Sequence, residues 1–399
     1  MTRQTTDILV SGGGVAGLAA AAAFGAEGFA VICVDPAPPI TDREADGADL
    51  RSTAFLQPSL PVLQAAGLWD RLAPFAAPLQ IMRIIDAGGP TSEPRLTEDF
   101  DAAEISDQPF GWNLPNWLLR REMVAALAQM PNVRFHPGVA TRGLTTRDRA
   151  AIVSLSDGTR VAARLVVAAD GRGSLLRETI GIGVKTIRYG QKALAFAVTH
   201  PIPHQNISTE IHRSGGPFTL VPLPDYNGSP SSAVVWMEAG PEVQRLAALP
   251  AADFEDAIAA RSCGILGPLT LASRRSVWPI ISQIAERMGG EGVALLAEAA
   301  HVVPPIGAQG LNMSLSDLSC LVGLAKGDPE NLGSRQMLED YHKARHRDLV
   351  TRVHGIDTLN RASMLGAPVL RDLRAAALSA LSSFTPLRQS LMRKGLGIG

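Results

Sequence analysis

The chain has 399 residues, of which 46% are apolar, enough to fill the cores of two domains. Lysine and arginine number 37 and aspartate and glutamate 38, so a net charge of −1 gives no general attraction for nucleic acid. No apolar run approaches the roughly 20 residues of a membrane-spanning helix. We therefore expect a soluble, cytoplasmic protein or one attached to a membrane surface. Three dispersed cysteines without metal-ligand spacing predict buried thiols in a reducing compartment and no metal site.

Residues 7–35 form a strand–helix–strand pattern around three glycines. The first strand is predicted at residues 8–10, the helix at 15–26 and the second strand at 29–34. Between the first strand and the helix the glycines follow G-x-G-x-x-G spacing: Gly12, Gly14 and Gly17.

This spacing predicts a dinucleotide site. Gly12 permits the tight turn, Gly14 lets the backbone approach a pyrophosphate, and Gly17 lets helix and strand pack closely. The second strand ends in Asp35, whose carboxylate can accept hydrogen bonds from an adenosine ribose. The segment alone does not distinguish NAD from FAD. The helix N-terminus also offers N–H groups to phosphate, those of Val15 and Ala16.

Two arginines are candidate anion ligands. Arg51 follows a long polar connection, residues 36–49, and we favour an anion or flavin contact over a solvated loop charge. Arg120 is predicted in the first turn of a helix at residues 119–130, where a cation is unfavourable. It should therefore have an anionic partner: a cofactor phosphate, Glu122 or a neighbouring acid.

A second strand-to-loop junction carries Asp170. The strand predicted at residues 165–169 runs into Asp170-Gly171 before a helix at 174–180, which places a carboxylate at the edge of the sheet where ligands gather. A plain turn explains Asp-Gly equally well.

The chain changes character over residues 185–277, where short strands broken by proline and glycine predict a mainly antiparallel second domain. Its histidines lack metal-ligand spacing, so we interpret them as structural or surface residues: His200, His204 and His212. Residues 292–315 then resemble the first domain again: a buried strand is followed by Ala297-Glu298, a Pro-Pro loop and a helix that begins with GAQG.

The three motifs together resemble those of single-component FAD-dependent aromatic hydroxylases, whose fold is similar to that of para-hydroxybenzoate hydroxylase. They are the dinucleotide segment, the strand-Asp170-Gly171 segment and AEAAHVVPPIGAQGLN, in that order. Within that class, DLRSTAFLQPS, YHKARHRD and HGIDTLNR resemble the ubiquinone-biosynthesis hydroxylases. The resemblance spans nearly the whole chain.

The resemblance implies an α/β fold with a Rossmann-like FAD-binding domain built on a parallel sheet, a smaller, mainly antiparallel substrate domain, and C-terminal helices. We assign residues 1–75, 98–182 and 288–345 to the discontinuous FAD-binding domain. Residues 76–97 and 183–287 form the substrate domain, and residues 346–399 the C-terminal helical segment.

Site residues follow from the same resemblance. Asp170 belongs to a motif implicated in both FAD and NAD(P)H handling, and Pro305 matches a proline beside the flavin ring, the one position we associate with catalysis. Glu298 keeps the carboxylate of the usual Gly-Asp pair, although Ala297 replaces the glycine. The pyrophosphate would lie on the three glycines and the ribose on Asp35. The remaining FAD contacts are Arg51, Arg120 and, at the helix terminus under flavin N1, Gly310, Leu311 and Asn312.

The implied activity is hydroxylation of a polyprenylated phenol in ubiquinone biosynthesis, through a flavin C4a-hydroperoxide, with NAD(P)H as reductant and O₂ as co-substrate. A pathway complex is the implied partner. One alternative is a hydroxylase of a small carboxylated phenol, which needs a buried arginine in the second domain, such as Arg188 or Arg213. Another is a non-catalytic flavoprotein scaffold, suggested by Ala297-Glu298.

The C-terminus has five basic residues and one acid between positions 371 and 394. One expectation is that this segment contacts the cytoplasmic face of the inner membrane as a peripheral element. A second is that its apolar side packs on the FAD-binding domain, and a third is a mixture of the two. That apolar face has helical spacing: Leu370, Leu373, Ala377, Leu381 and Phe384.

Overall fold

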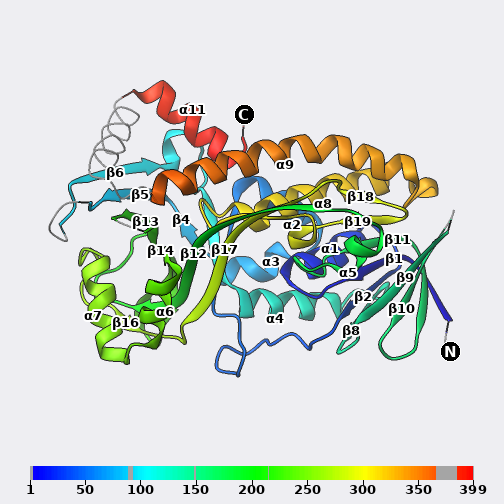
Figure 1. Ribbon diagram of the computed structural model, residues 1–399, viewed down its shortest axis with the longest axis horizontal. Helices are drawn as coiled ribbons and strands as arrows, with labels where there is room; N and C mark the ends of the chain where they lie inside the picture. The colour runs from blue at the N-terminus through cyan, green and yellow to red at the C-terminus, as the bar shows by residue number, and fades with distance from the viewer. Residues whose placement is uncertain (1–2, 89–92, 148–149, 214, 365–383, 399) are drawn as a thin grey trace.

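The structure is a computed structural model that describes residues 3–88, 93–147, 150–213, 215–364 and 384–398. Figure 1 shows two sheet-containing halves with a long helix running across both. Within these ranges no helix is both long and apolar enough to cross a lipid bilayer.

The first half is a parallel sheet with helices packed on it. Its parallel strands carry buried, mainly apolar runs toward their carboxyl ends, which is typical of a parallel sheet covered on both faces, except for the last strand at one edge, which is only partly buried. In the order β19-β11-β1-β2-β8 they are Val293–Leu295, Arg160–Ala168, Arg3–Ser11, Val31–Asp35 and Val133–Pro137. The edge carries three antiparallel strands: β18 (Gly289–Gly290), β9 (Thr141–Arg147) and β10 (Ala150–Leu155). The helices of this half are α1 (Val15–Ala26), α4 (Asn116–Leu127), α5 (Leu175–Thr179) and α8 (Gln309–Gly327).

The second half is a nine-stranded sheet in which every pair is antiparallel except β13 with β5. From the edge inward lie β20 (His301–Val302), β17 (Ser276–Ala285), β12 (Val184–Thr199) and β15 (Ser229–Ala239). Beyond them lie β14 (Pro217–Tyr226), β13 (Ile207–His212), β5 (Ile81–Asp86) and β6 (Leu96–Asp101), while β16 (Thr270–Leu271) pairs with β12. One face packs Leu194, Phe196 and Val198 against α6 (Gly240–Ala248) and α7 (Ala251–Arg261).

Smaller elements join the halves. A three-stranded sheet, β3-β7-β4, comprises Ser52–Leu56, Gly111–Pro115 and Ala77–Leu79. Along the chain, β3 is followed by η1 (Gln57–Ser59), α2 (Leu60–Ala65) and α3 (Trp69–Leu72). The 30-residue helix α9 (Arg335–Met364) reaches from β18 to the second sheet, and α11 (Thr385–Leu396) lies beside it near the C-terminus (Figure 1).

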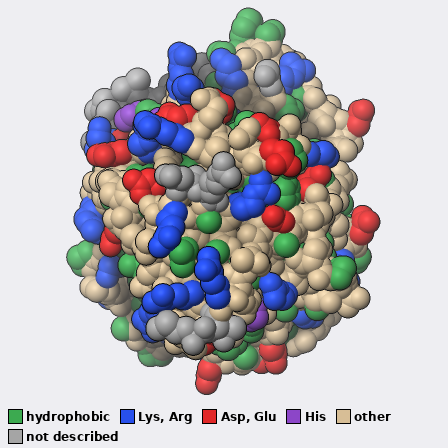
Figure 2. Space-filling model, turned by 90° about the vertical axis from the view of Figure 1, so that its right-hand side faces the viewer, with side chains coloured by type: hydrophobic (Ala, Val, Ile, Leu, Met, Phe, Trp, Pro, Cys, Tyr) green, Lys and Arg blue, Asp and Glu red, His purple; other side chains and the backbone are tan. Residues whose placement is uncertain are grey.

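The α/β architecture with a parallel and a mainly antiparallel sheet is confirmed. The helix expected at 119–130 instead begins at Asn116 and ends at Leu127, so Arg120 lies in its second turn rather than its first. The division into domains stays a prediction, and β6 crosses its boundary at residue 97. Of the apolar C-terminal face, Phe384 is described; Leu370, Leu373, Ala377 and Leu381 lie outside the described residues. Figure 2 shows arginines and lysines interspersed with acidic residues on the face that it presents.

Candidate cofactor and substrate site

The turn between β1 and α1 needs its three glycines for different reasons. Gly12 has φ +116°, and a Cβ there would lie 2.2 Å from the Ala169 carbonyl oxygen. A Cβ on Gly17 would lie 1.9 Å from the Gly12 carbonyl oxygen. Gly14 differs, because no atom outside its neighbouring residues lies within 4 Å of the position of its Cβ. The fold therefore requires Gly12 and Gly17, whereas Gly14 opens a space at the start of α1, where N–H groups of the first turn can meet a pyrophosphate.

Asp35 closes the same turn from the end of β2. One carboxylate oxygen accepts a hydrogen bond from the Gly13 N–H at 2.6 Å, and the other accepts one from the Ala37 N–H at 2.8 Å. A carboxylate has about four acceptor positions, so Asp35 can hold the loop and still accept ribose hydroxyls. The residues present thus fit the dinucleotide half of FAD.

Asp49 brings together the two arginines that the sequence singled out. Its carboxylate accepts hydrogen bonds from Arg51 at 2.7 and 2.8 Å, from Asn116 at 3.1 Å and from Arg120 at 3.5 Å. Burial favours the neutral acid, but these hydrogen bonds and positive charges outweigh it and hold the pKa of Asp49 below its ordinary value. Arg120 therefore has the neighbouring acid that was one of its three expected partners, while Glu122 instead pairs with Arg71 and Arg121.

Arg51 connects this cluster to the second sheet and to the third motif. Its guanidinium lies 4.1 Å from the ring centroid of Trp278 on β17, a cation–π contact. Burial lowers the pKa of Arg51, but the hydrogen bond and charge of Asp49, with a further contribution from the charge of Glu298, raise it above its ordinary value. Arg51 is thus a permanent cation between the two halves of the molecule.

Asp170 lies where β11 ends, beside the glycine turn. One of its oxygens accepts a long hydrogen bond, 3.4 Å, from the Leu176 N–H. The other is buried and has no hydrogen-bond partner among the described residues. Burial raises the pKa of this carboxyl above its ordinary value. An unpartnered buried carboxylate oxygen is costly unless a ligand donates to it, so Asp170 fits a contact with a cofactor hydroxyl.

The third motif follows β19. Ala297 has φ +55°, in the left-handed region that favours glycine, the residue expected at this position of the motif. Glu298 is exposed in the 3₁₀ turn η4 (Ala297–Ala299). Buried Arg177 of α5 joins this turn to the second motif, because it donates hydrogen bonds to the carbonyls of Ala299 at 3.0 Å and Arg172 at 2.9 Å.

The Pro-Pro loop and the start of α8 complete the site. Pro305 is exposed, and Ala308, with φ +56°, precedes the helix. Gly310 and Leu311 lie in the first turn, whose N–H groups lack intrahelical partners. An anionic group is favoured at such a terminus.

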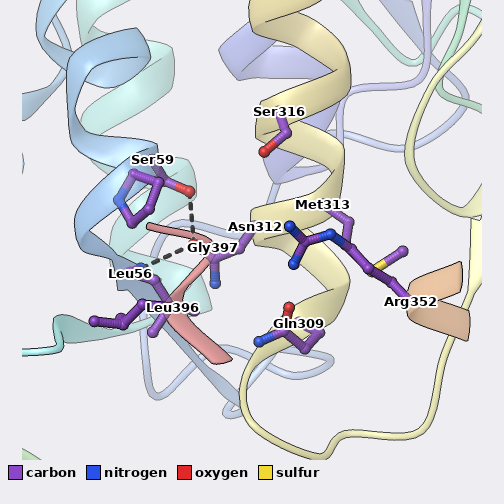
Figure 3. A pocket seen from close by; sticks show the side chains of 10 residues that line it. Leu56, Ser59, Gln309, Asn312, Met313, Ser316, Arg352, Leu396 and Gly397 are labelled. Atoms are coloured by element: carbon purple, nitrogen blue, oxygen red, sulfur yellow. Dashed lines mark hydrogen bonds between the residues drawn. The ribbon is translucent and has the colours of Figure 1, made fainter. Parts of the chain in front are cut away.

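Asn312 has a structural role that sequence reasoning missed. Its side-chain oxygen accepts hydrogen bonds from the Leu56 N–H at 2.8 Å and the Ser59 hydroxyl at 2.7 Å. Its side-chain nitrogen donates to the carbonyls of Ala54 at 2.8 Å and Ala308 at 2.6 Å. The amide is therefore fully committed to fixing α8 against β3 and η1, and a contact between Asn312 and FAD stays a prediction. Figure 3 shows this junction, with Arg352 and the C-terminal residues Leu396 and Gly397 beside it.

A buried charged group behind the Pro-Pro loop was also missed. His301 and Arg345 both contact the carboxylate of Asp317, at 2.8 and 2.7 Å, and Asp317 is fully buried. These residues come from β20, α9 and α8, and no spacing in the sequence links three separate elements. Asp49 was missed too, although its position two residues before Arg51 could have suggested the pairing from the sequence.

The histidines of the second sheet have structural partners. His200 contacts the Ile202 carbonyl at 2.8 Å and the Ser232 hydroxyl at 3.0 Å. His204 contacts the Leu223 carbonyl at 3.1 Å. Their interpretation as structural residues accords with these contacts.

Comparison with known proteins gives a family and a fold. The family model described as "FAD binding domain" matches residues 5–353. The ubiquinone hydroxylase UbiL of Rhodospirillum rubrum is 31% identical, over 99% of this chain and 90% of its own length. The 3-demethoxyubiquinol 3-hydroxylase of Escherichia coli is 27% identical, over the full length of both chains. The crystal structure of p-nitrophenol 4-monooxygenase PnpA from Pseudomonas putida superimposes with a TM-score of 0.80 at 18% identity, covering 99% of each chain.

Proposed function

The chain belongs to the FAD-binding-domain family and is an FAD-dependent monooxygenase, and from that premise we propose that it hydroxylates the aromatic ring of a polyprenylated phenol in ubiquinone biosynthesis. The full-length similarity to proteins named as ubiquinone hydroxylases supports the pathway. We propose NAD(P)H as the reductant and the enzymes that handle neighbouring intermediates as partners.

The proposal of a polyprenylated substrate rests on one observation: in the second sheet, the face opposite α6 and α7 is apolar. Alternate residues of β12 on this face are alanines, paired in register with residues of β15 that are also apolar. Ala193 lies opposite Trp278 of β17, on which Arg51 stacks, so this face is turned toward the cofactor side. The face comprises Ala193, Ala195, Ala197, Ala233, Val235 and Met237.

A small carboxylated phenol fits this face less well. Arg188 is exposed at the bulge of β12. Arg213 extends toward the carbonyl of Ala260 on α7, at 3.5 Å, which is the opposite side of the sheet. Arg51 already has Asp49 as counter-charge. Neither arginine proposed for that alternative is therefore positioned on the apolar face to neutralise a substrate carboxylate.

The residues divide the work in a way that suits this reaction. FAD, when bound, supplies the activation of dioxygen, the step that amino-acid side chains cannot perform. Gly14, Asp35 and Asp170 would hold the cofactor, Arg51 supplies positive charge between the two halves, and the start of α8 supplies a positive helix end. The apolar sheet face would exclude water from the ring to be hydroxylated. The non-catalytic scaffold alternative is disfavoured, because proteins similar over the full length are named as hydroxylases.

The test is genetic and chemical. Deleting the encoding gene should cause a polyprenylated ubiquinone precursor that lacks one ring hydroxyl to accumulate, as identified by mass spectrometry of quinone extracts. The wild-type gene should restore ubiquinone, and a Gly14→Val variant should not. Unchanged ubiquinone in the deletion strain, with growth defective only on a small aromatic carbon source, would instead favour the small-phenol alternative.

Because the proposed substrate carries a long apolar tail, we also propose that the enzyme works at the cytoplasmic face of the inner membrane as a peripheral protein. Basic residues near an anionic leaflet are attracted to it.

A further inference from the structure

Three large apolar side chains are exposed on one short helix. Phe384, which caps α11, is 60% exposed, and Leu387 and Leu391 are 42% and 43% exposed. Their spacing of three and four residues places them on one side of the helix. Exposed apolar residues that gather on one surface, rather than being scattered singly, mark a contact site.

The side of α11 that includes Met392 and Leu396, and the positions between that side and the stripe, are fixed to the enzyme. Met392 and Leu396 are buried. Arg388 pairs with Glu104 at 2.6 Å, and the Gln309 side chain donates a hydrogen bond to the Gly395 carbonyl at 3.2 Å. The apolar stripe, defined as Phe384, Leu387 and Leu391, is therefore presented on a helix whose other side is already committed to packing.

The charged side chains that α11 itself carries are all basic. From residue 384 to residue 399 the sequence contains three basic residues and no aspartate or glutamate. Arg393 and Lys394 are exposed in the last turn of α11. Lys394 follows Leu391 by three residues and shares its side of the helix, whereas Arg393 follows it by two and lies away from the stripe. An exposed apolar stripe with a lysine beside it is suited to lie in the headgroup region of an anionic bilayer.

We propose that α11 docks the enzyme on an anionic lipid surface through Phe384, Leu387 and Leu391, with Lys394 in contact with the headgroups. The choice of a lipid occupant rests in part on the proposed function, since a polyprenylated substrate resides in the bilayer. A second copy of the chain fits less well. Three partly exposed side chains offer much less than the about 800 Å² per partner of a standard interface, and two such basic helices would repel each other.

The docking would place a defined part of the enzyme next to the membrane. Leu396 and Gly397 continue α11 into the junction formed by Ser59 of η1 and Gln309 of α8 (Figure 3). The end of α8 that we assign to the cofactor site is thus held against the lipid-facing helix by direct contacts. A substrate leaving the bilayer beside α11 would enter close to that end.

The test is flotation of the full-length FAD-bound enzyme with vesicles of phosphatidylglycerol and phosphatidylcholine in equal parts, compared with vesicles of phosphatidylcholine alone. Wild type should float with the anionic vesicles. Leu387→Ser with Leu391→Ser should weaken that binding about tenfold or more, because the apolar contact is lost. Lys394→Gln should weaken it about fivefold, and less at high salt, whereas Arg393→Gln, on the side of the helix away from the stripe, should weaken it less.

The matched control is Ile202→Ser, which removes a side chain that is 48% exposed outside α11 and should float as wild type does. All variants replace exposed side chains, so flavin content should be unchanged and confirms folding. The proposal is overturned if wild type does not float, if the double serine variant floats equally well, or if that variant instead abolishes a dimer seen by light scattering. Because flotation requires no turnover, its failure leaves the hydroxylase proposal standing, and a floating protein without hydroxylase activity would refute only the latter.

Discussion

Replacing Ala297 by glycine should stabilise the protein. Ala297 has φ +55°, and a left-handed backbone costs an L-residue roughly 1–2 kcal/mol. Glycine removes that cost but gives the unfolded chain more freedom, which offsets about 0.5–1 kcal/mol. The expected net gain in the free energy of unfolding is about 0.5–1 kcal/mol by these magnitudes.

The assay is urea unfolding of the apoprotein, in which bound FAD cannot contribute to stability. The midpoint should rise while the slope with urea stays constant. Ala300→Gly is the control, because Ala300 is buried with φ −93° and has no strain to release. It should lose about 1–2 kcal/mol, from one buried methyl group and added chain entropy. An Ala297→Gly protein that is no more stable than wild type, or that is destabilised as much as Ala300→Gly, would refute the strained turn.

Four further substitutions separate cofactor binding from folding. Gly14→Val should abolish FAD binding with little change in circular dichroism, since its Cβ position is open, whereas Gly17→Val should unfold the protein; equal unfolding of both would contradict this. Glu298→Ala should weaken FAD binding about 10- to 100-fold, as expected when a charge-assisted bond worth roughly 1.5–3 kcal/mol is lost; unchanged calorimetric affinity would mean that this carboxylate points elsewhere. Asp170 has a raised pKa in the folded state, so its contribution to stability is present below the ordinary value of 3.8 and is lost as the pH rises through the folded-state pKa. Asp170→Asn should therefore stabilise the apoprotein at neutral pH and flatten the pH dependence of unfolding in the acid range, and an unaltered pH profile would show that Asp170 is not desolvated.

Local patterns in the sequence singled out residues that the structure brings together. The glycine spacing, Asp35 and the strand-to-Asp170 junction each depend on a few consecutive residues, and the structure places all of them at one edge of the parallel sheet. Consecutive residues also identified the third motif, but they did not predict its backbone conformation. The positive φ of Ala297 depends on how β19 joins η4. An alanine there conflicts with residue preference, so composition could not reveal it.

Long-range partners were beyond the reach of sequence patterns. The exact start of α4 decides whether Arg120 lies in the first or second turn, and its partner Asp49 lies 71 residues earlier. Asn312 meets Ser59 across 253 residues. Such pairs arise from packing of separate elements and leave no periodic signal in a single sequence.

The most direct measurement is incorporation of labelled oxygen. The purified enzyme, reconstituted with FAD and supplied with NAD(P)H and ¹⁸O₂, is given a phenolic ubiquinone precursor with a short prenyl chain. Mass spectrometry should find one ¹⁸O atom on the aromatic ring of the product, with none when Gly14→Val enzyme is used. A protein that binds FAD and consumes NAD(P)H but releases only hydrogen peroxide, with this substrate and with unprenylated phenols unchanged, would contradict the assignment as a ring hydroxylase.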